Sequence, residues 1–343
     1  MRVSELCLGA MTFGGATPLE EARAILDRFA DAGGNFVDTA VNYAGGASEE
    51  MLGRLIAGKR ERFVVATKYG APLRAGDPGS GGNHARGLRQ ALELSLRRLG
   101  TDHVDLLWVH AWDQITPLEE LVRVLEGAVR SGKVLQVGIS NTPAWAVARA
   151  DALAEASGSA RPVAIQVEYN LAARDVEREL VPMSRELGMA VIAWGPLAGG
   201  LLTGKYLGEP GRGGAPPEPD SGAPPPRPGT GAPGRLAAAE PRRLAPGDRR
   251  LSQRNLDLAA EAARIAAEHG ADPAAVALAW LLARPARPLP ILGVRTAAQL
   301  DQLLACLDLR LPDEAIARLD GVSAPELGYP HDFLARVRAA YAP

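Results

Sequence analysis

Short apolar segments rich in β-branched residues alternate along this chain with longer segments whose apolar residues recur every three to four positions. The first pattern is typical of buried strands and the second of amphipathic helices. Eight strand-like segments can be recognised, at 6–8, 36–38, 63–68, 104–110, 134–140, 163–168, 189–194 and 289–292. Strands that alternate with helices form parallel sheets. Eight of them in 343 residues predict an α/β fold of the closed (β/α)8, or TIM barrel, type, in one domain spanning 1–343.

One segment departs from this alternation. Residues 209–248 contain 11 Pro and 8 Gly, and their only large apolar residues are Leu236 and Leu244. Such a composition buries too little apolar surface to order itself, so we expect a disordered loop. It follows the seventh predicted strand, on the face where barrel loops build active sites. A mobile lid and an insertion without a role are both compatible with this position.

Charge, apolar run length and cysteine content narrow the class of function. The 38 Lys and Arg against 40 Asp and Glu give a net charge of −2, which offers no electrostatic footprint for nucleic acid. The longest apolar run, 274–283, is far shorter than a membrane span. Cys7 and Cys306 form no metal or redox spacing, and no secretory signal is visible. We therefore expect a soluble, cytoplasmic protein without nucleic-acid or membrane partners.

Four side chains able to carry chemistry lie at or just beyond the ends of successive predicted strands: Asp38, Tyr43, Lys68 and His110. Each of them alone is also compatible with a purely structural role. In the same order, these roles are a turn cap, loop packing, a solvated strand end and a core imidazole. In a barrel, however, the carboxyl ends of the strands converge on one mouth, so their coincidence favours an active site. The five histidines show no H-x-H or H-E-x-x-H spacing, and we expect no metal.

Longer motifs surround these residues: D-T-A-V-N-Y at 38–43, A-T-K-Y-G at 66–70, D-L-L-W-V-H at 105–110, G-I-S-N at 138–141, Q-V-E-Y-N at 166–170, W-G-P-L at 194–197, L-T-G-K at 202–205 and V-A-L-A-W-L-L at 276–282. With them the sequence resembles the aldo-keto reductase family, in the branch of the aryl-alcohol dehydrogenases and potassium-channel β subunits. The resemblance covers almost the whole chain. It implies NADPH-dependent reduction of an aldehyde or ketone, or of an imine, with Asp38, Tyr43, Lys68 and His110 as the catalytic tetrad.

The residue types suggest a role for each member of this tetrad. A carbonyl that accepts hydride needs a proton and stabilisation of the developing alkoxide. Tyr43 is the candidate acid: a free phenol has a pKa of about 10, and we expect the Lys68 ammonium to lower it. Asp38 would hold the ammonium by an ion pair, and His110 would donate a hydrogen bond to the carbonyl oxygen. Only four lysines occur in the chain, and Lys68 is one of them. A planar arginine side chain would fit the space between Asp38 and Tyr43 badly.

The resemblance also implies a site for NADP. Trp194 would stack on the nicotinamide, with Asp38 nearby, and Ser140, Asn141 and Gln166 would bind the carboxamide. The other implied cofactor residues are Ala10 and Met11 by their backbone, Gly195, Pro196, Leu197, Gly199 and Lys205 along the pyrophosphate, and Gly293, Arg295 and Gln299 near the adenosine phosphate. Gln302 lies at the adenine position, where the family usually has Glu-Asn and this sequence has Gln302-Leu303, so one amide contact to adenine is lost. Arg295 could pair with a 2′-phosphate, which favours NADP over NAD. The implied substrate pocket is lined by Phe13, Tyr43, His110, Trp112 and Asn170.

Two other functions compete with the reductase. A nucleotide-binding regulatory subunit of the same fold would bind cofactor with little turnover, but such subunits typically replace His110. A barrel lyase or hydrolase without nicotinamide is disfavoured by Trp194 with the carboxamide set. The chain also begins almost at the first strand, without the hairpin that usually plugs the barrel bottom in this family. Two alternatives are compatible with this: the true start of the chain lies upstream, or a partner subunit covers the opening, so a homo-oligomer is allowed. We also expect a bacterial source.

Overall fold

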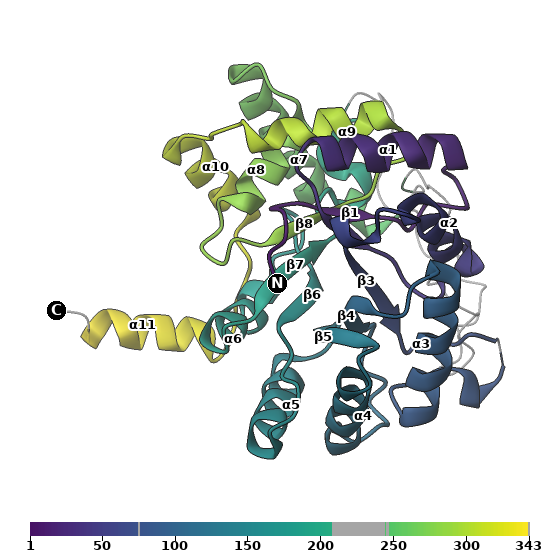
Figure 1. The fold of residues 1–343 in the computed structure, drawn as a ribbon. Coiled ribbons are helices and arrows are strands. Elements are labelled where there is room, and N and C mark those ends of the chain that lie inside the picture. The colour runs from purple at the N-terminus through teal and green to yellow at the C-terminus, as the bar shows by residue number, and fades with distance from the viewer. Residues whose placement is uncertain (75, 208–243, 245–246, 342–343) are drawn as a thin grey trace, which may run out of the picture.

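In the computed structural model each strand pairs in parallel with the next and β8 pairs with β1, so the sheet closes into a barrel (Figure 1). The structure describes residues 1–74, 76–207, 244 and 247–341. The strands are β1 (Cys7–Gly9), β2 (Phe36–Asp38), β3 (Val64–Tyr69), β4 (Val104–Val109), β5 (Val134–Ser140), β6 (Ala164–Glu168), β7 (Ala190–Trp194) and β8 (Leu289–Leu292). The predicted (β/α)8 barrel is confirmed, with strand ends within one residue of those expected.

Helices surround the barrel, and most of them bury one apolar face against it (Figure 1). They are α1 (Leu19–Asp31), α2 (Ala47–Ile56), α3 (Ala85–Leu99), α4 (Leu118–Arg130), α5 (Ala144–Ser157), α6 (Leu180–Glu186), α7 (Gln253–Glu268), α8 (Pro273–Leu282), α9 (Ala297–Leu304), α10 (Asp313–Ser323) and α11 (His331–Tyr341). The apolar spacing of residues 176–187 predicts a helix over that whole range, whereas α6 begins at Leu180. Pro182 accounts for the difference, because a proline is accommodated only in the first turn of a helix.

Alternate side chains of each strand point into the barrel. Ala66, Trp108, Ala164 and Ile192 belong to the interior cluster, whereas the residues between them pack outward against the helices. Because strand side chains repeat every two residues, the positions two residues further along also point inward, now at the carboxyl end of the barrel. These positions are Lys68, His110, Gln166 and Trp194. The strand period therefore directs the predicted site residues into one mouth.

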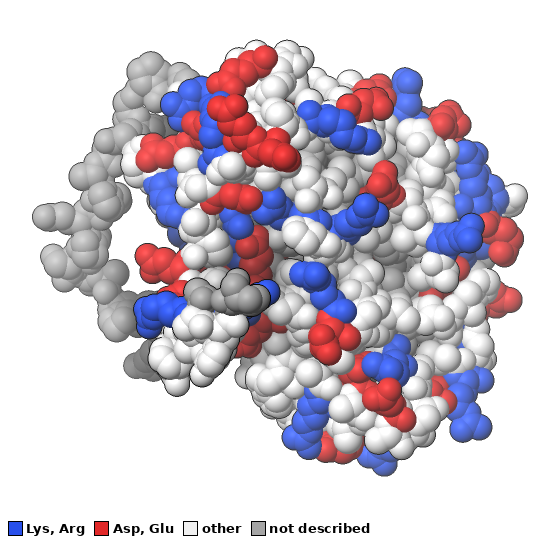
Figure 2. All heavy atoms as spheres, turned by 90° about the vertical axis from the view of Figure 1, so that its left-hand side faces the viewer, with Lys and Arg blue, Asp and Glu red and all other residues white. Residues whose placement is uncertain are grey.

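Most of the predicted loop at 209–248 lies outside the described residues, and so does the lid proposed for it. Among the helices that the structure describes, none is long and apolar enough to cross a membrane. The last helix, α11, extends away from the barrel toward the left of the view (Figure 1). Figure 2 shows the molecule from that side, on which Lys and Arg are interspersed with Asp and Glu.

Candidate active site

A buried ion pair lies at the centre of the barrel mouth. Lys68, on β3, donates through Nζ to Asp38 Oδ2 at the end of β2 and to the Thr39 carbonyl at 2.8 Å. The lysine and aspartate side chains are 1% and 3% exposed. Burial alone would lower the pKa of Lys68, but the carboxylate and the neighbouring phenol raise it above its ordinary value. The ammonium therefore stays charged out of contact with water.

Tyr43 lies above this ammonium. It begins a 3₁₀ turn, Tyr43–Gly46, in the loop after β2, and Lys68 Nζ lies 4.7 Å from the centre of its ring. We expected the ammonium to lower the pKa of the phenol. Burial of the phenol has the larger effect and raises the pKa of Tyr43 above its usual value. The Lys68 charge lowers this pKa but does not cancel the effect of burial. The phenol is therefore protonated at neutral pH.

His110 closes the other side of the mouth, just beyond β4. Its ring meets that of Tyr43 edge-on, with centroids 5.9 Å apart and an interplanar angle of 81°. Burial and the nearby Lys68 charge lower the pKa of His110 to about 3, so the imidazole is neutral. Among the described residues, Nδ1 has no hydrogen-bond partner. A neutral imidazole keeps one N–H donor, which can serve a carbonyl oxygen.

The polar residues assigned to the carboxamide form one network around Asn141. Asn141 Nδ2 donates to the His110 carbonyl at 2.8 Å and to Ser140 Oγ at 2.9 Å, and its Oδ1 accepts from Trp194 Nε1 at 3.0 Å. Gln166 Nε2 donates to Asp38 Oδ1 at 3.0 Å. Trp194 is half-buried. The indole is thus held in one orientation with part of its ring accessible, beside amides and a hydroxyl that suit a carboxamide.

The loop after β7 offers a place for phosphates. Gly199 and Gly200 adopt positive φ values of 68° and 86°, and a Cβ on Gly200 would fall 2.5 Å from Lys205 Nζ. The absence of side chains here lets the Lys205 ammonium lie against the backbone of Gly200 and the Arg250 guanidinium against that of Gly199, so two positive charges gather at this turn. Pro196 is buried, Gly195 and Leu197 are half-buried and Lys205 is exposed. These features fit a dinucleotide pyrophosphate.

The residues expected near the adenosine phosphate and adenine lie just before α9 and along it. Gly293, Arg295, Gln299 and Gln302 are all exposed, and Gln299 Oε1 accepts from the Arg295 backbone N–H at 2.9 Å. Thr12 Oγ1 donates to the Val294 carbonyl at 3.1 Å, which joins this segment to the loop after β1. Within that loop Ala10 is buried and Met11 is 47% exposed. The structure therefore brings both ends of the implied cofactor site to the same side of the barrel.

Two of the residues expected to line the substrate pocket do not reach an open surface. Phe13 is completely buried in the core between the barrel and its helices. Asn170 is 1% exposed, and its amide is already used: Nδ2 donates to the Gly195 carbonyl at 2.9 Å, and Oδ1 accepts from the backbone of Ala172 and Ala173. Asn170 thus braces the loops after β6 and β7. Trp112 is half-buried, two residues beyond His110.

Sequence reasoning missed the residues that hold the Tyr43 loop. Arg98, on α3, donates to the Val41 carbonyl at 2.7 Å and to the Gly45 carbonyl at 3.3 Å, on either side of Tyr43. It also pairs with the fully buried Glu49, which accepts from Thr67 Oγ1 at 2.7 Å. No local motif identifies Arg98, because it lies on the helix before β4 and meets the loop only in the folded chain.

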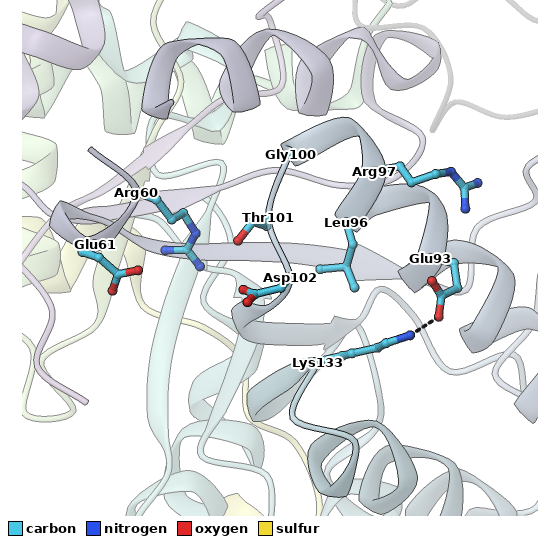
Figure 3. Close-up of a pocket in the computed structure, with 9 residues that line it drawn as sticks. All are labelled: Arg60, Glu61, Glu93, Leu96, Arg97, Gly100, Thr101, Asp102 and Lys133. Carbon is cyan, nitrogen blue, oxygen red and sulfur yellow. Dashed lines mark hydrogen bonds and ion pairs between the residues drawn. The ribbon is translucent and has the colours of Figure 1, made fainter. Parts of the chain in front are cut away.

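A hollow of about 720 Å³ lies elsewhere, lined by Arg60, Glu61, Glu93, Leu96, Arg97, Gly100, Thr101, Asp102 and Lys133 (Figure 3). Its residues precede β3, β4 and β5 or lie on α3, so it opens at the opposite end of the barrel from Lys68 and His110. Lys133 and Glu93 pair with each other across it. This hollow is separate from the tetrad.

Comparison with known proteins agrees with the geometry. The model of the aldo/keto reductase family matches residues 5–324. Norsolorinic acid reductase stcV of Emericella nidulans is 36% identical over 350 residues, covering 97% of this chain and 82% of that protein. The uncharacterized oxidoreductase YrpG of Bacillus subtilis is 37% identical over 334 residues (94% and 93%), and the putative aryl-alcohol dehydrogenase AAD14 of Saccharomyces cerevisiae is 31% identical over 350 residues (97% and 87%).

These relatives are fungal and bacterial, so the expected bacterial source stays a prediction. The match over nearly the whole chain, on a closed eight-stranded barrel, settles the class of protein. The chain belongs to the aldo/keto reductase family and is an NAD(P)H-dependent reductase of carbonyl compounds.

Proposed function

We propose that this protein uses NADPH to reduce an aldehyde or ketone, or an imine, with Tyr43 as the general acid. The observation that carries the proposal is the buried ammonium of Lys68, which pairs with Asp38 and lies 4.7 Å from the centre of the Tyr43 ring. A phenol in this setting is protonated at neutral pH, and the ammonium would stabilise the phenolate that proton transfer leaves.

The residues that would hold the cofactor are Trp194 against the nicotinamide, the Ser140, Asn141 and Gln166 set at the carboxamide, the 195–205 loop at the pyrophosphate, and Arg295 near a 2′-phosphate. When bound, NADPH supplies the hydride for the carbonyl carbon. The hydrogen bond from Trp194 Nε1 to Asn141 supports this assignment, because it fixes the indole by one edge and leaves a face of the ring for the nicotinamide.

The chain's own residues then handle the proton and the charge. Tyr43 would donate its hydroxyl proton to the carbonyl oxygen, and Lys68 would balance the phenolate. Asp38 keeps the ammonium in place, and the neutral His110 would orient the carbonyl by an N–H bond. Because these groups are fixed before the substrate arrives, little reorganisation is needed during reaction.

We propose that the substrate is a small carbonyl compound and that the protein acts in the cytoplasm. Several relatives are named aryl-alcohol dehydrogenases, which supports an aromatic carbonyl as a first choice for assay.

The decisive experiment follows NADPH consumption by wild type and Tyr43→Phe with a panel of aryl and aliphatic aldehydes and ketones. The variant should lose at least about a hundredfold in kcat, as expected for removal of a general acid, while its Kd for NADPH stays within about twofold. Undiminished reduction by Tyr43→Phe would remove the proton-donor role. Tight NADPH binding without turnover of any substrate by wild type would instead favour the regulatory function.

A second measurement addresses cofactor choice. Kd values for NADPH and NADH are compared in wild type and Arg295→Ala. We expect NADPH to bind more tightly and Arg295→Ala to weaken NADPH selectively, since a paired arginine recognises only the 2′-phosphate. A wild-type preference for NADH would contradict the role of Arg295.

A further inference from the structure

An exposed tryptophan lies beside the mouth and has no role in the tetrad or in cofactor binding. Trp145, in the first turn of α5, is 57% exposed. Its ring packs edge-to-face against Trp112, with centroids 5.4 Å apart and an interplanar angle of 82°. Ile115, in the same loop as Trp112, is 86% exposed. Exposed aromatic side chains in such a cluster are characteristic of binding surfaces.

This pair connects directly to the reacting centre. Trp112 follows His110 by two residues, and Trp145 follows Asn141 by four. Asn141 itself bonds both the His110 carbonyl and Trp194. Trp112 follows β4 and Trp145 opens the helix after β5, so the two tryptophans border the mouth on the β4 and β5 side.

The loop that carries Trp112 is rigid. Asn83 and Asp113 exchange hydrogen bonds, with the Asp113 N–H donating to Asn83 Oδ1 at 2.7 Å and the Asn83 N–H to Asp113 Oδ2 at 2.8 Å. Trp112 Nε1 donates to the Thr116 carbonyl at 3.2 Å. A surface fixed in this way loses little conformational entropy when a ligand binds.

The same hydrogen bonds indicate the chemistry of the ligand. Asp113 Oδ1 accepts from the Ile115 and Thr116 backbone, and its Oδ2 accepts from Asn83 and the Thr116 hydroxyl. A sugar would need polar side chains beside the aromatic rings to bind its hydroxyl groups. The Asp113 carboxylate and the Asn83 amide already bond to the loop, so they favour a ligand without hydroxyl groups. A flat hydrocarbon ring needs only the apolar faces.

We propose that Trp145 and Trp112 form an outer acceptor subsite, which binds the distal ring of a carbonyl compound with two or more fused aromatic rings. The inference rests on the proposed function, since the carbonyl of that compound is placed at Tyr43. It assigns to Trp145 a selectivity between fused-ring and single-ring substrates that the tetrad cannot supply.

The test compares kcat/KM for 2-naphthaldehyde and benzaldehyde, which carry the same aldehyde on different ring systems. Trp145→Ala should lower the value for 2-naphthaldehyde about tenfold, mainly through KM, because a lost aromatic contact has about that effect. Benzaldehyde should change less than about twofold. Trp145→Phe should restore most of the preference. Phe333→Ala, which removes an aromatic side chain of similar exposure (50%) on α11, away from the barrel, is the matched control (Figure 1).

Direct binding separates failure of this inference from failure of the proposed function. Titration of 2-naphthalenemethanol, the corresponding alcohol, into wild type and Trp145→Ala by calorimetry needs no turnover. If no aldehyde is reduced but Trp145→Ala weakens this binding, the reductase proposal fails and the subsite stands. Equal losses for both aldehydes, or a change in oligomeric mass without a change in selectivity, would overturn the subsite and assign Trp145 to general stability or to a subunit contact.

Discussion

Replacing either partner of the Asp38–Lys68 ion pair should destabilise the barrel as a whole. The two side chains are 3% and 1% exposed, and each makes one further bond, to Gln166 and to the Thr39 carbonyl. Removing one partner leaves the other charge buried without compensation, which typically costs about 3–5 kcal/mol. We expect Asp38→Leu and Lys68→Met each to lower the free energy of unfolding by this amount.

The double variant Asp38→Leu/Lys68→Met should behave differently. A buried ion pair replaced by apolar groups of similar size is often neutral or stabilising, because the desolvation of both charges is avoided. The double variant is therefore expected to unfold close to wild type while lacking activity. Such an outcome would show that the ion pair serves catalysis and adds nothing to the free energy of unfolding.

Urea unfolding followed by tryptophan fluorescence and circular dichroism measures all four proteins, and the double-mutant cycle isolates the coupling between the two side chains. Single variants that lose less than about 1 kcal/mol would place the pair in the range of exposed salt bridges and refute the burial argument. A double variant that loses the sum of the single effects would refute the coupling.

Two further predictions concern support for the site. Gly138→Ala should cost about 1–3 kcal/mol in urea unfolding, because its Cβ would lie 2.4 Å from the Trp108 ring; an unchanged midpoint would show that the ring moves aside. Arg98→Ala should lower kcat without changing Kd for NADPH, since Arg98 holds the carbonyls of Val41 and Gly45 around the acid, and Arg98→Lys should recover part of the loss. A change confined to Kd would contradict this positioning role.

The mouth was predictable because one rule, the two-residue period of a strand, fixes where Lys68 points once Ala66 is inside the barrel. Parallel strands in a closed sheet then bring Asp38, Lys68 and His110 together at their carboxyl ends. These conclusions depend only on local chemistry and on the topology that alternation implies.

Other features depended on tertiary packing that no local pattern encodes. Phe13 has a plausible position after β1, but the turn there sends its ring into the core. Asn170 follows β6 as expected, yet its amide is consumed by the Gly195 carbonyl and two backbone N–H groups. The contact between Trp145 and Trp112 joins two loops that are distant in sequence.

The sign of the Tyr43 pKa shift depends in the same way on depth of burial, and it determines the expected pH dependence. Burial outweighs the Lys68 charge, so the phenol stays protonated well into the alkaline range. Reduction consumes this proton, and kcat/KM for the carbonyl should stay level through neutral pH and fall only above the usual pKa of tyrosine. Oxidation of the alcohol needs the phenolate and should rise over that same alkaline range. A reduction profile that declines with an apparent pKa near 7 would show instead that the ammonium dominates, as its charge alone would suggest.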